Sequence, residues 1–266
     1  MTSAHVAAKR ALSVPTLALR WLRRVPRSWI LTFHEIGDHP WAVAPDAFRR
    51  IVGAVADVAD VVRLSTLVGE PPKSRTRVAI TFDDGYVGAA SDALPWLVAR
   101  GLPATVFLPT GLLRDEPTVP PTESRLYADL PLLGWDDVRR WQATGLVAFG
   151  GHGSTHRPLP ALAPAARREE LSRCREALLA HGCAEADAIA YPLGAFDEAT
   201  LTDAREAGFR IGLTTVHGGV GRRTPRLALP RVDVRRGYGP GDVLCAVRGD
   251  WDGLALAHRL RRRRAP

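Results

Sequence analysis

Residues 78–86 read Val-Ala-Ile-Thr-Phe-Asp-Asp-Gly-Tyr, an apolar run rich in β-branched residues that ends on two adjacent carboxylates. The run predicts a buried strand whose C-terminal end presents Asp83 and Asp84 to a pocket, and Gly85 would let the backbone turn there. Neighbouring carboxylates resist ionising together unless a cation compensates, so the pair suits metal binding or acid–base catalysis. A buried strand that ends in an ordinary Asp-Gly turn explains the same residues. The rest of the chain has to distinguish these two interpretations.

Strand and helix candidates alternate on both sides of this strand, with short connections between them. Strands are expected at residues 29–33, 61–64, 104–108, 147–149, 188–191, 211–214 and 227–234, and helices at 45–60, 89–100, 136–144, 161–181 and 197–207. Residues 111–133, rich in proline and polar side chains, are expected to form an excursion above the sheet. The alternation predicts parallel βα units, and their number favours an α/β barrel over an open sheet.

In such barrels the chemistry lies at the C-terminal ends of the strands. Four polar residues follow strand candidates in this way: His34, Asp83, Asp84 and His152. The segment His-Gly-Ser-Thr-His at 152–156 adds a second histidine, His156. If the segment forms a helical turn, both imidazoles point the same way and can share one cation with a carboxylate. Two unrelated surface histidines are the alternative.

Composition and charge narrow the class of protein. The chain has 266 residues, 46% of them hydrophobic, enough for one large domain or two small ones. The net charge is +8 and nearly all of the basic residues are arginine, a usage that looks like coding bias, so no nucleic-acid partner is expected. The cysteines Cys174, Cys183 and Cys245 are odd in number and lack Cys-x-x-Cys spacing, which favours free thiols over a disulfide framework. A single Cys174–Cys183 bridge is the alternative.

Both ends of the chain are basic. We divide it into an N-terminal arm (1–28), an α/β barrel (29–250) and a C-terminal tail (251–266) that contains an arginine run at 261–264. The apolar run in the arm is interrupted by Pro15, is followed by arginines instead of a cleavage site, and is too short to span a bilayer. A cytoplasmic location is therefore expected. Peripheral contact of the basic ends with anionic lipid at the inner membrane is the alternative to ordinary solvated ends.

Taken together, the motifs resemble the polysaccharide deacetylase family, also called the NodB-homology or carbohydrate esterase 4 group. The two principal motifs are Thr-Phe-Asp-Asp-Gly at 81–85 and His-Gly-Ser-Thr-His at 152–156. Residues 190–194 resemble the family's third motif, and 30–34 and 229–232 resemble an opening and a late strand of the subgroup with the poly-N-acetylglucosamine deacetylases of biofilm systems. The matches run from about residue 30 to 234, and their order is more specific than any one motif.

The resemblance implies a distorted (β/α) barrel of about seven parallel strands and metal-dependent removal of an N-acyl group, with acetyl expected, from an amino sugar. By motif position the metal ligands are Asp84, His152 and His156, and Asp83 is the general base. The backbone N–H of Leu193 would stabilise the oxyanion together with the metal. Zinc is the expected divalent metal, and nickel, cobalt and manganese ligate similarly. The expected partner is an N-acetylated sugar or polysaccharide.

The proton donor departs from the common family pattern. Many members supply it from a Leu-x-His motif near the C-terminus, but the last histidine here, His258, lies beside the basic tail and outside any strand pattern. In the subgroup with an early Tyr-His motif, the early histidine is the acid, which maps to His34. The alternative is that His34 is an ordinary histidine at a strand end.

Two other positions also depart from the pattern. Ala190 takes the place of an arginine that usually orients the base. Arg231 from the late strand is expected to substitute by pairing with Asp83, or else it is an ordinary strand-end arginine. Gly153 stands where the family prefers Ser or Thr, which removes a hydrogen bond that shapes the loop but removes no ligand.

Two rival functions remain open at this stage. One is a deformylase or deacetylase acting on a lipid-linked sugar at the inner face of the membrane, which the basic ends favour. The other is a non-catalytic carbohydrate-binding relative that keeps the barrel. The complete set of Asp83, Asp84, His152 and His156 argues against the second, because a protein that only binds has no need of all four.

Overall fold

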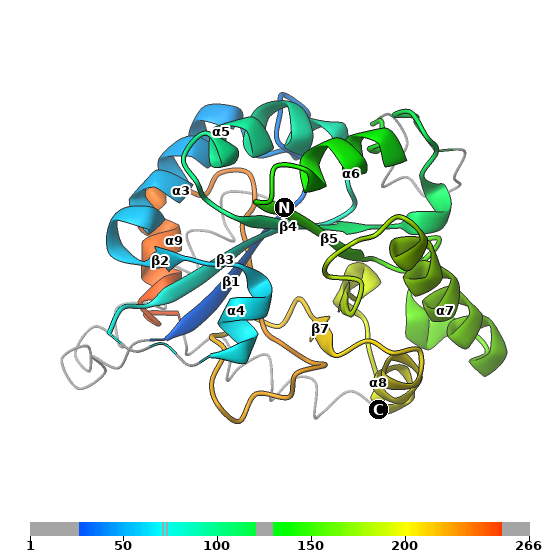
Figure 1. The fold of residues 1–266 in the computed structure, drawn as a ribbon. Helices are drawn as coiled ribbons and strands as arrows, with labels where there is room; N and C mark the ends of the chain where they lie inside the picture. The colour runs from blue at the N-terminus through cyan, green and yellow to red at the C-terminus, as the bar shows by residue number, and fades with distance from the viewer. Residues whose placement is uncertain (1–26, 71, 73, 121–129, 252–266) are drawn as a thin grey trace.

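The computed structural model describes residues 27–70, 72, 74–120 and 130–251 (Figure 1). Most of the predicted N-terminal arm and nearly all of the predicted C-terminal tail, including His258, lie outside these residues. Within the described part of the chain, no helix is long and apolar enough to cross a membrane.

In the described residues, eight strands form one sheet, and every pairing between them is parallel. The strands are β1 (Ser28–Phe33), β2 (Asp60–Val61), β3 (Arg77–Phe82), β4 (Ala104–Leu108), β5 (Val147–Gly151), β6 (Ala188–Ala190), β7 (Ile211–Leu213) and β8 (Val232–Asp233). Seven of them follow the order β7-β6-β5-β4-β3-β1-β8, and the short β2 pairs with the beginning of β3. The distorted (β/α) barrel that the sequence predicts is confirmed.

The last strand candidate, residues 227–234, divides between two partners. Its first part runs beside β7, where the Leu229 N–H donates to Gly212 O at 2.7 Å and Leu229 O accepts from the Thr214 N–H at 2.9 Å. Its second part is β8, which pairs with β1. Pro230, which has no N–H to donate, stands between the two parts. The prediction of one continuous strand is wrong, because this segment crosses from β7 to β1 and closes the barrel.

Helices cover the outside of the barrel, with α3 and α5 on the side of β3 and β4, and α6 and α7 beside β5 (Figure 1). The α-helices are α3 (Pro45–Val58), α4 (Leu64–Gly69), α5 (Leu94–Val98), α6 (Trp135–Gln142), α7 (Pro164–Ala180), α8 (Glu198–Glu206) and α9 (Pro240–Val247). A π-helical turn, η2 (Ala89–Ala93), and three 3₁₀ turns, η3 (Thr110–Leu112), η4 (Leu159–Ala161) and η5 (Pro192–Gly194), complete the helical segments.

Two of the predicted elements are wrong in kind. The single helix expected at 89–100 is the π-helical turn η2 followed by α5, because Pro95 has no N–H with which to continue an α-helical ladder. The strand expected at 61–64 ends at Val61, and Leu64 already begins α4. The helix expected at 161–181 begins later, at Pro164, after the 3₁₀ turn η4.

Successive side chains along each strand alternate between two apolar clusters. In β1, Leu31 and Phe33 pack outward against the helices. Ile30 instead joins an inner cluster with Ala79 of β3, and Leu67 of α4 belongs to the same cluster. The interior of the barrel is therefore filled by apolar side chains, with α4 packed against them at the base.

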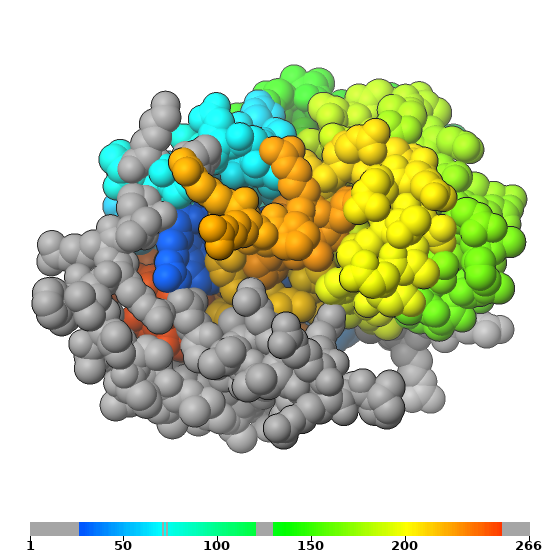
Figure 2. All heavy atoms as spheres, turned by 90° about the horizontal axis from the view of Figure 1, so that it is seen from below, coloured from blue at the N-terminus to red at the C-terminus, as the bar shows by residue number. Residues whose placement is uncertain are grey.

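The base of the barrel is visible in Figure 2, where the segment after β7 (orange) and the chain around α4 (cyan) lie beside the start of β1 (blue). Ser28 at that start forms an antiparallel bridge with Val220. A groove of about 770 Å³ runs between these segments. It is lined by Ser28, Leu67 and Val220 among others, so it lies at the end of the barrel opposite to the predicted site.

Candidate metal centre and active site

Inward-facing positions place the predicted site residues at the C-terminal ends of the strands. Counting by twos from the inward-facing Ile30 reaches His34, just beyond β1. The same count from Ala79 reaches Asp83, just beyond β3. His152 lies just beyond β5. Since the strands are parallel, all three side chains gather at one end of the barrel.

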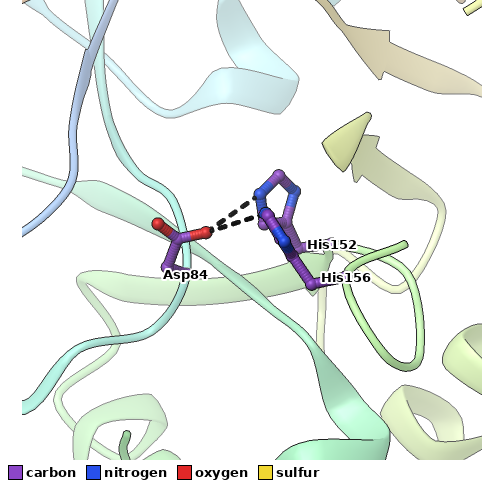
Figure 3. A group of neighbouring side chains, drawn as sticks. All are labelled: Asp84, His152 and His156. Atoms are coloured by element: carbon purple, nitrogen blue, oxygen red, sulfur yellow. Dashed lines mark ion pairs between the residues drawn. The ribbon is translucent and has the colours of Figure 1, made fainter. Parts of the chain in front are cut away.

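Asp84, His152 and His156 converge on one point (Figure 3). Asp84 Oδ1 lies 3.2 Å from His152 Nε2 and 3.3 Å from His156 Nε2, and all three residues are buried. Metal–ligand bonds of about 2.0–2.1 Å at a tetrahedral angle would place two ligand atoms about 3.3 Å apart. The spacing of these atoms therefore fits one divalent cation held by one carboxylate and two imidazoles.

The protonation states of two ligands also fit a cation. Burial raises the pKa of Asp84, but the hydrogen bonds from His152 and His156 outweigh burial and hold this pKa well below its ordinary value. Asp84 is therefore ionised at neutral pH. His152 Nδ1 lies 2.7 Å from the carbonyl oxygen of Ala190. A carbonyl only accepts, so Nδ1 carries a proton, and loss of the Nε2 proton that contacts Asp84 would leave a lone pair there for a cation.

The backbone is strained at three of the predicted site residues. Among the described residues other than glycine, positive φ occurs at Asp84 (71°), His156 (60°) and Leu193 (58°). Left-handed backbone costs free energy for side chains other than glycine and is concentrated at functional sites. Each of these residues follows a different strand, so the chain turns sharply at the rim of the barrel in three separate places.

The segment 152–156 is a loop, so the helical turn that the spacing suggested is wrong. Gly153 has φ of 73° and His156 has φ of 60°, values that an α-helix does not contain. The two imidazole rings nevertheless converge, with centroids 4.8 Å apart. The loop brings the histidines together through its left-handed turns, which the i, i+4 spacing does not reveal.

Asp83 is not part of the candidate metal-binding group but forms a buried ion pair with Arg231. The guanidinium contacts both carboxylate oxygens, with Nη1–Oδ1 at 2.7 Å and Nη2–Oδ2 at 2.6 Å. It also donates from Nη1 to Thr32 Oγ1 and from Nε to Thr214 O, each at 2.9 Å. Burial raises the pKa of Asp83, but the positive charge of Arg231 and, further off, His152 and His34 hold it below its ordinary value. Asp83 is therefore an ionised carboxylate in a fixed orientation.

His34 and Leu193 border this centre from other strands. His34 is half-buried, and its charge acts on both Asp83 and Asp84. Leu193 lies in the turn η5 after β6, with its side chain 57% exposed. The structure thus gathers the predicted residues from β1, β3, β5, β6 and the closing segment around one centre.

The family model described as "Polysaccharide deacetylase" matches residues 70–212, more than half of the chain. The chain belongs to the polysaccharide deacetylase family. The matched range contains Asp83, the three candidate metal ligands and Leu193, whereas His34 and Arg231 lie outside it.

One curated relative and two solved structures show what the chain is similar to in sequence and in fold. YxkH of Bacillus subtilis (strain 168), whose name assigns it to the polysaccharide deacetylases by inference, is 28% identical over 171 residues, which are 64% of this chain. The match spans 56% of the length of that relative. The fold resembles the Streptococcus pyogenes deacetylase PplD in complex with acetate (TM-score 0.69, 21% identity, 84% of this chain and 99% of that one). It also resembles IcaB from Ammonifex degensii (TM-score 0.71, 20% identity, 85% of this chain and 98% of that one).

Two residues near the candidate metal centre were missed by sequence reasoning. Tyr86 is buried, and its hydroxyl hydrogen-bonds to Asp84. Burial and the nearby charges of Asp84 and Glu35 raise the Tyr86 pKa, so Tyr86 stays a neutral donor. Its place two residues after Asp84 was the available signal. The second residue is Glu170 of α7, which contacts the histidine loop and has no motif to mark it.

Proposed function

We propose that this protein is a metal-dependent hydrolase that removes an N-acyl group, with acetyl expected, from an amino sugar in a polysaccharide or glycoconjugate. The observation that carries the proposal is that two adjacent aspartates at one strand end have different partners. Asp84 faces two histidines as a metal ligand, whereas Asp83 is held apart by Arg231 as a base. Adjacent carboxylates in different environments are typical of sites that need both roles.

Asp84, His152 and His156 would hold a divalent cation, which would supply Lewis-acid chemistry to water and to the amide carbonyl. Asp83 then accepts the proton of the attacking water. Its bidentate contact with Arg231 keeps the carboxylate in one orientation and ionised at neutral pH. The remaining lone pairs of the two oxygens are available to take that proton.

Two further residues complete the proposed reaction. The backbone N–H of Leu193 donates to the oxyanion that forms as water adds to the carbonyl. The left-handed turn at Leu193 supports this role, because it bends the backbone sharply at the rim. His34 donates the proton that the amine needs in order to leave, and its half-buried place beyond β1 lets it exchange protons with solvent.

A sugar substrate is supported by apolar side chains exposed around the same rim. Trp41, between β1 and α3, is 42% exposed, and its ring centroid lies 5.4 Å from that of Tyr86, which bonds Asp84. Aromatic faces pack well against the apolar face of a sugar ring, and binding sites are commonly lined in this way. Trp41→Ala is expected to raise KM several-fold with little change in kcat, and Leu179→Ala, exposed on α7, serves as the matched control.

The decisive experiment is metal-dependent acetate release from chitooligosaccharides and a simple N-acetyl sugar. The purified protein is assayed with and without chelator, beside Asp83→Asn, which keeps the shape of the side chain but removes the base. Loss of general-base catalysis is expected to lower the rate by about 10²–10⁴-fold. Release that needs neither metal nor Asp83 would refute the mechanism.

Failure to release acetate has two distinct meanings. Stoichiometric metal binding without release would direct the search to formylated or lipid-linked sugars, including one presented at the cytoplasmic face of the inner membrane. Absence of both metal and release would remove the ligand assignment and favour a non-catalytic carbohydrate-binding protein.

A further inference from the structure

The loop 152–156 is fixed from two sides by neighbouring elements. On one side, the N–H groups of Thr110 and Gly111 in η3 donate to the carbonyl oxygens of Gly153 and Ser154 at 3.2 and 2.8 Å. On the other side the partner is a carboxylate from α7. Because α7 lies well beyond the loop in sequence, the contact joins two separate elements.

That carboxylate belongs to Glu170. Its Oε1 accepts the backbone N–H of Thr155 at 2.5 Å and the Thr155 hydroxyl at 3.0 Å, and its Oε2 lies 3.1 Å from the same hydroxyl. Glu170 is only 8% exposed, whereas Thr155 is exposed, so these bonds lie at the edge of the buried interior. Hydrogen bonds to a buried charged acceptor are stronger than those between neutral groups.

The face of α7 that carries Glu170 packs under the end of β5 and the first residues of the loop. Cys174, one turn further on, has its sulfur 2.6 Å from where a Cβ on Gly151 would lie. Leu178, another turn on, lies 3.4 Å from the same position. The contact of Glu170 with Thr155 is therefore one end of a helix–loop interface that also supports His152 from beneath.

Gly153 and Glu170 depend on each other sterically. A Cβ at Gly153 would lie 3.2 Å from Glu170 Oε1 and 3.4 Å from Pro192 Cγ, and the glycine has φ of 73°. A side chain at 153 would therefore crowd the carboxylate as well as strain the backbone. With glycine at 153, the Glu170 carboxylate keeps this place without the shift of a few tenths of an ångström that a Cβ would require.

We infer that Glu170 is a positioning residue for the metal centre, replacing a loop hydrogen bond that Gly153 cannot make. It acts through Thr155, whose N–H immediately precedes the left-handed His156, and so holds the His156 imidazole toward Asp84. The inference rests on the proposed function, because it takes Asp84, His152 and His156 as a metal site. Partners that orient metal ligands typically contribute about 10–100-fold to metal affinity.

The test compares Glu170→Ala with Glu169→Ala. Glu169 precedes Glu170 on the same helix but is exposed and pairs with Arg173, so its loss removes an equal charge without touching the loop. Affinity for Zn²⁺ is measured by competition with a chromophoric chelator, and the Co²⁺-substituted proteins are compared by visible absorption. Glu170→Ala is expected to bind Zn²⁺ about 10–100-fold more weakly and to alter the Co²⁺ spectrum, whereas Glu169→Ala should match the wild type.

Two additional variants separate positioning from a general loss of folding. Glu170→Gln keeps Oε1 as an acceptor for the Thr155 N–H and is expected to restore most of the affinity. Gly153→Ala is expected to weaken metal binding in the wild-type background and to do so less in the Glu170→Ala background, where the crowded carboxylate is gone. Equal Zn²⁺ affinities and spectra for the two alanine variants at 170 and 169 would overturn the inference. Wild-type protein that binds no metal would instead overturn the proposed function, and the inference with it.

Discussion

The two ends of the barrel use the same inward-facing strand positions for opposite purposes. At the base, Ile30 and Ala79 pack with Leu67 of α4 in an apolar cluster. Four residues further along β1 and β3, the same face carries His34 and Asp83. An apolar side chain needs only contact there, whereas a buried ionisable one needs hydrogen bonds or an opposite charge. The end that carries the candidate metal centre is therefore held by specific partners, whereas the opposite end is held by packing.

The difference predicts that the two ends fail in different ways. Substitutions at the rim should remove metal binding or shift a pH profile, even in a protein that stays folded. Substitutions at the base should lower stability and leave the chemistry of the folded molecules intact.

The largest effect is expected from His156→Asn. Asparagine tolerates the left-handed backbone at this position, so the loop keeps its shape while the imidazole ligand is lost. A direct ligand should matter more than a supporting residue, so Zn²⁺ affinity and deacetylation are expected to fall by about 100-fold or more. Titration with Zn²⁺ and thermal melting of the metal-free protein check this. A metal-free Tm far below that of the wild type would show that the rim also serves packing.

Arg231→Met should damage both stability and chemistry. It leaves Asp83 buried without its counter-charge, which typically costs about 3–5 kcal/mol. The lowered pKa of Asp83 stabilises the fold above its ordinary pKa, and this contribution is lost as the pH falls through the lowered value. The difference in Tm between wild type and variant is therefore expected to narrow in acid, where Asp83 of the variant takes a proton.

The same variant should shift the pH profile of the reaction. Without Arg231, burial raises the pKa of Asp83, so the acid limb of kcat/KM is expected to move to higher pH. Arg231→Lys keeps the charge but loses the two-point contact and should be intermediate. An unchanged profile and unchanged activity in Arg231→Met would show that the ion pair does not serve the base.

Leu67→Ala tests the opposite end of the barrel. The side chain is buried in the inner cluster, and removal of such a side chain typically costs about 2–5 kcal/mol. Urea denaturation is expected to show this loss, while kcat and Zn²⁺ affinity of the folded fraction stay at wild-type values. A matching loss of metal affinity would show that the packing at the base sets the geometry of the rim.

Glu35→Gln is expected to have the smallest effect and to depend on pH. Burial raises the pKa of Glu35 to about 7 against the opposing hydrogen bond from Gly88, and Asp92 raises it slightly further. Between its ordinary pKa of 4.5 and about 7 the folded protein holds a proton that the unfolded chain releases, so stability falls as the pH rises through this window. Glutamine stays neutral and should raise the Tm at pH 8 by a few degrees but hardly at pH 5. An equal change at both pH values would contradict this account.

Much of the fold followed from the sequence because local signals agreed with the tertiary structure. The apolar run at 78–82 and the period-two count from Ile30 and Ala79 both point to one end of the barrel, and the structure brings Asp84 together with the two histidines there. The conformation of the loop 152–156 could not be predicted, because the sign of φ at His156 depends on tertiary hydrogen bonds and not on its residue type.

Contacts between segments that are distant in the sequence were the second feature that could not be predicted. Glu170 lies in a helix that reads as an ordinary amphipathic segment, and only folding brings it to Thr155. The continuous strand expected at 227–234 failed for a related reason, because no local pattern shows that a segment will change partners halfway. The pairing of Arg231 with Asp83 was anticipated only through the resemblance to a family that keeps an arginine beside its base.

Because Arg231 lies late in the sequence, the ion pair between Asp83 and Arg231 can form only after most of the chain has been synthesised. During synthesis, Asp83 leaves the ribosome 148 residues before Arg231. A nascent chain that stops short of Arg231 lacks the strand that closes the barrel. It also lacks the guanidinium that pairs with Asp83. The last strand of the barrel to be synthesised thus follows directly on the counter-charge of Asp83, and a product truncated before Arg231 is expected to leave that carboxylate buried without it.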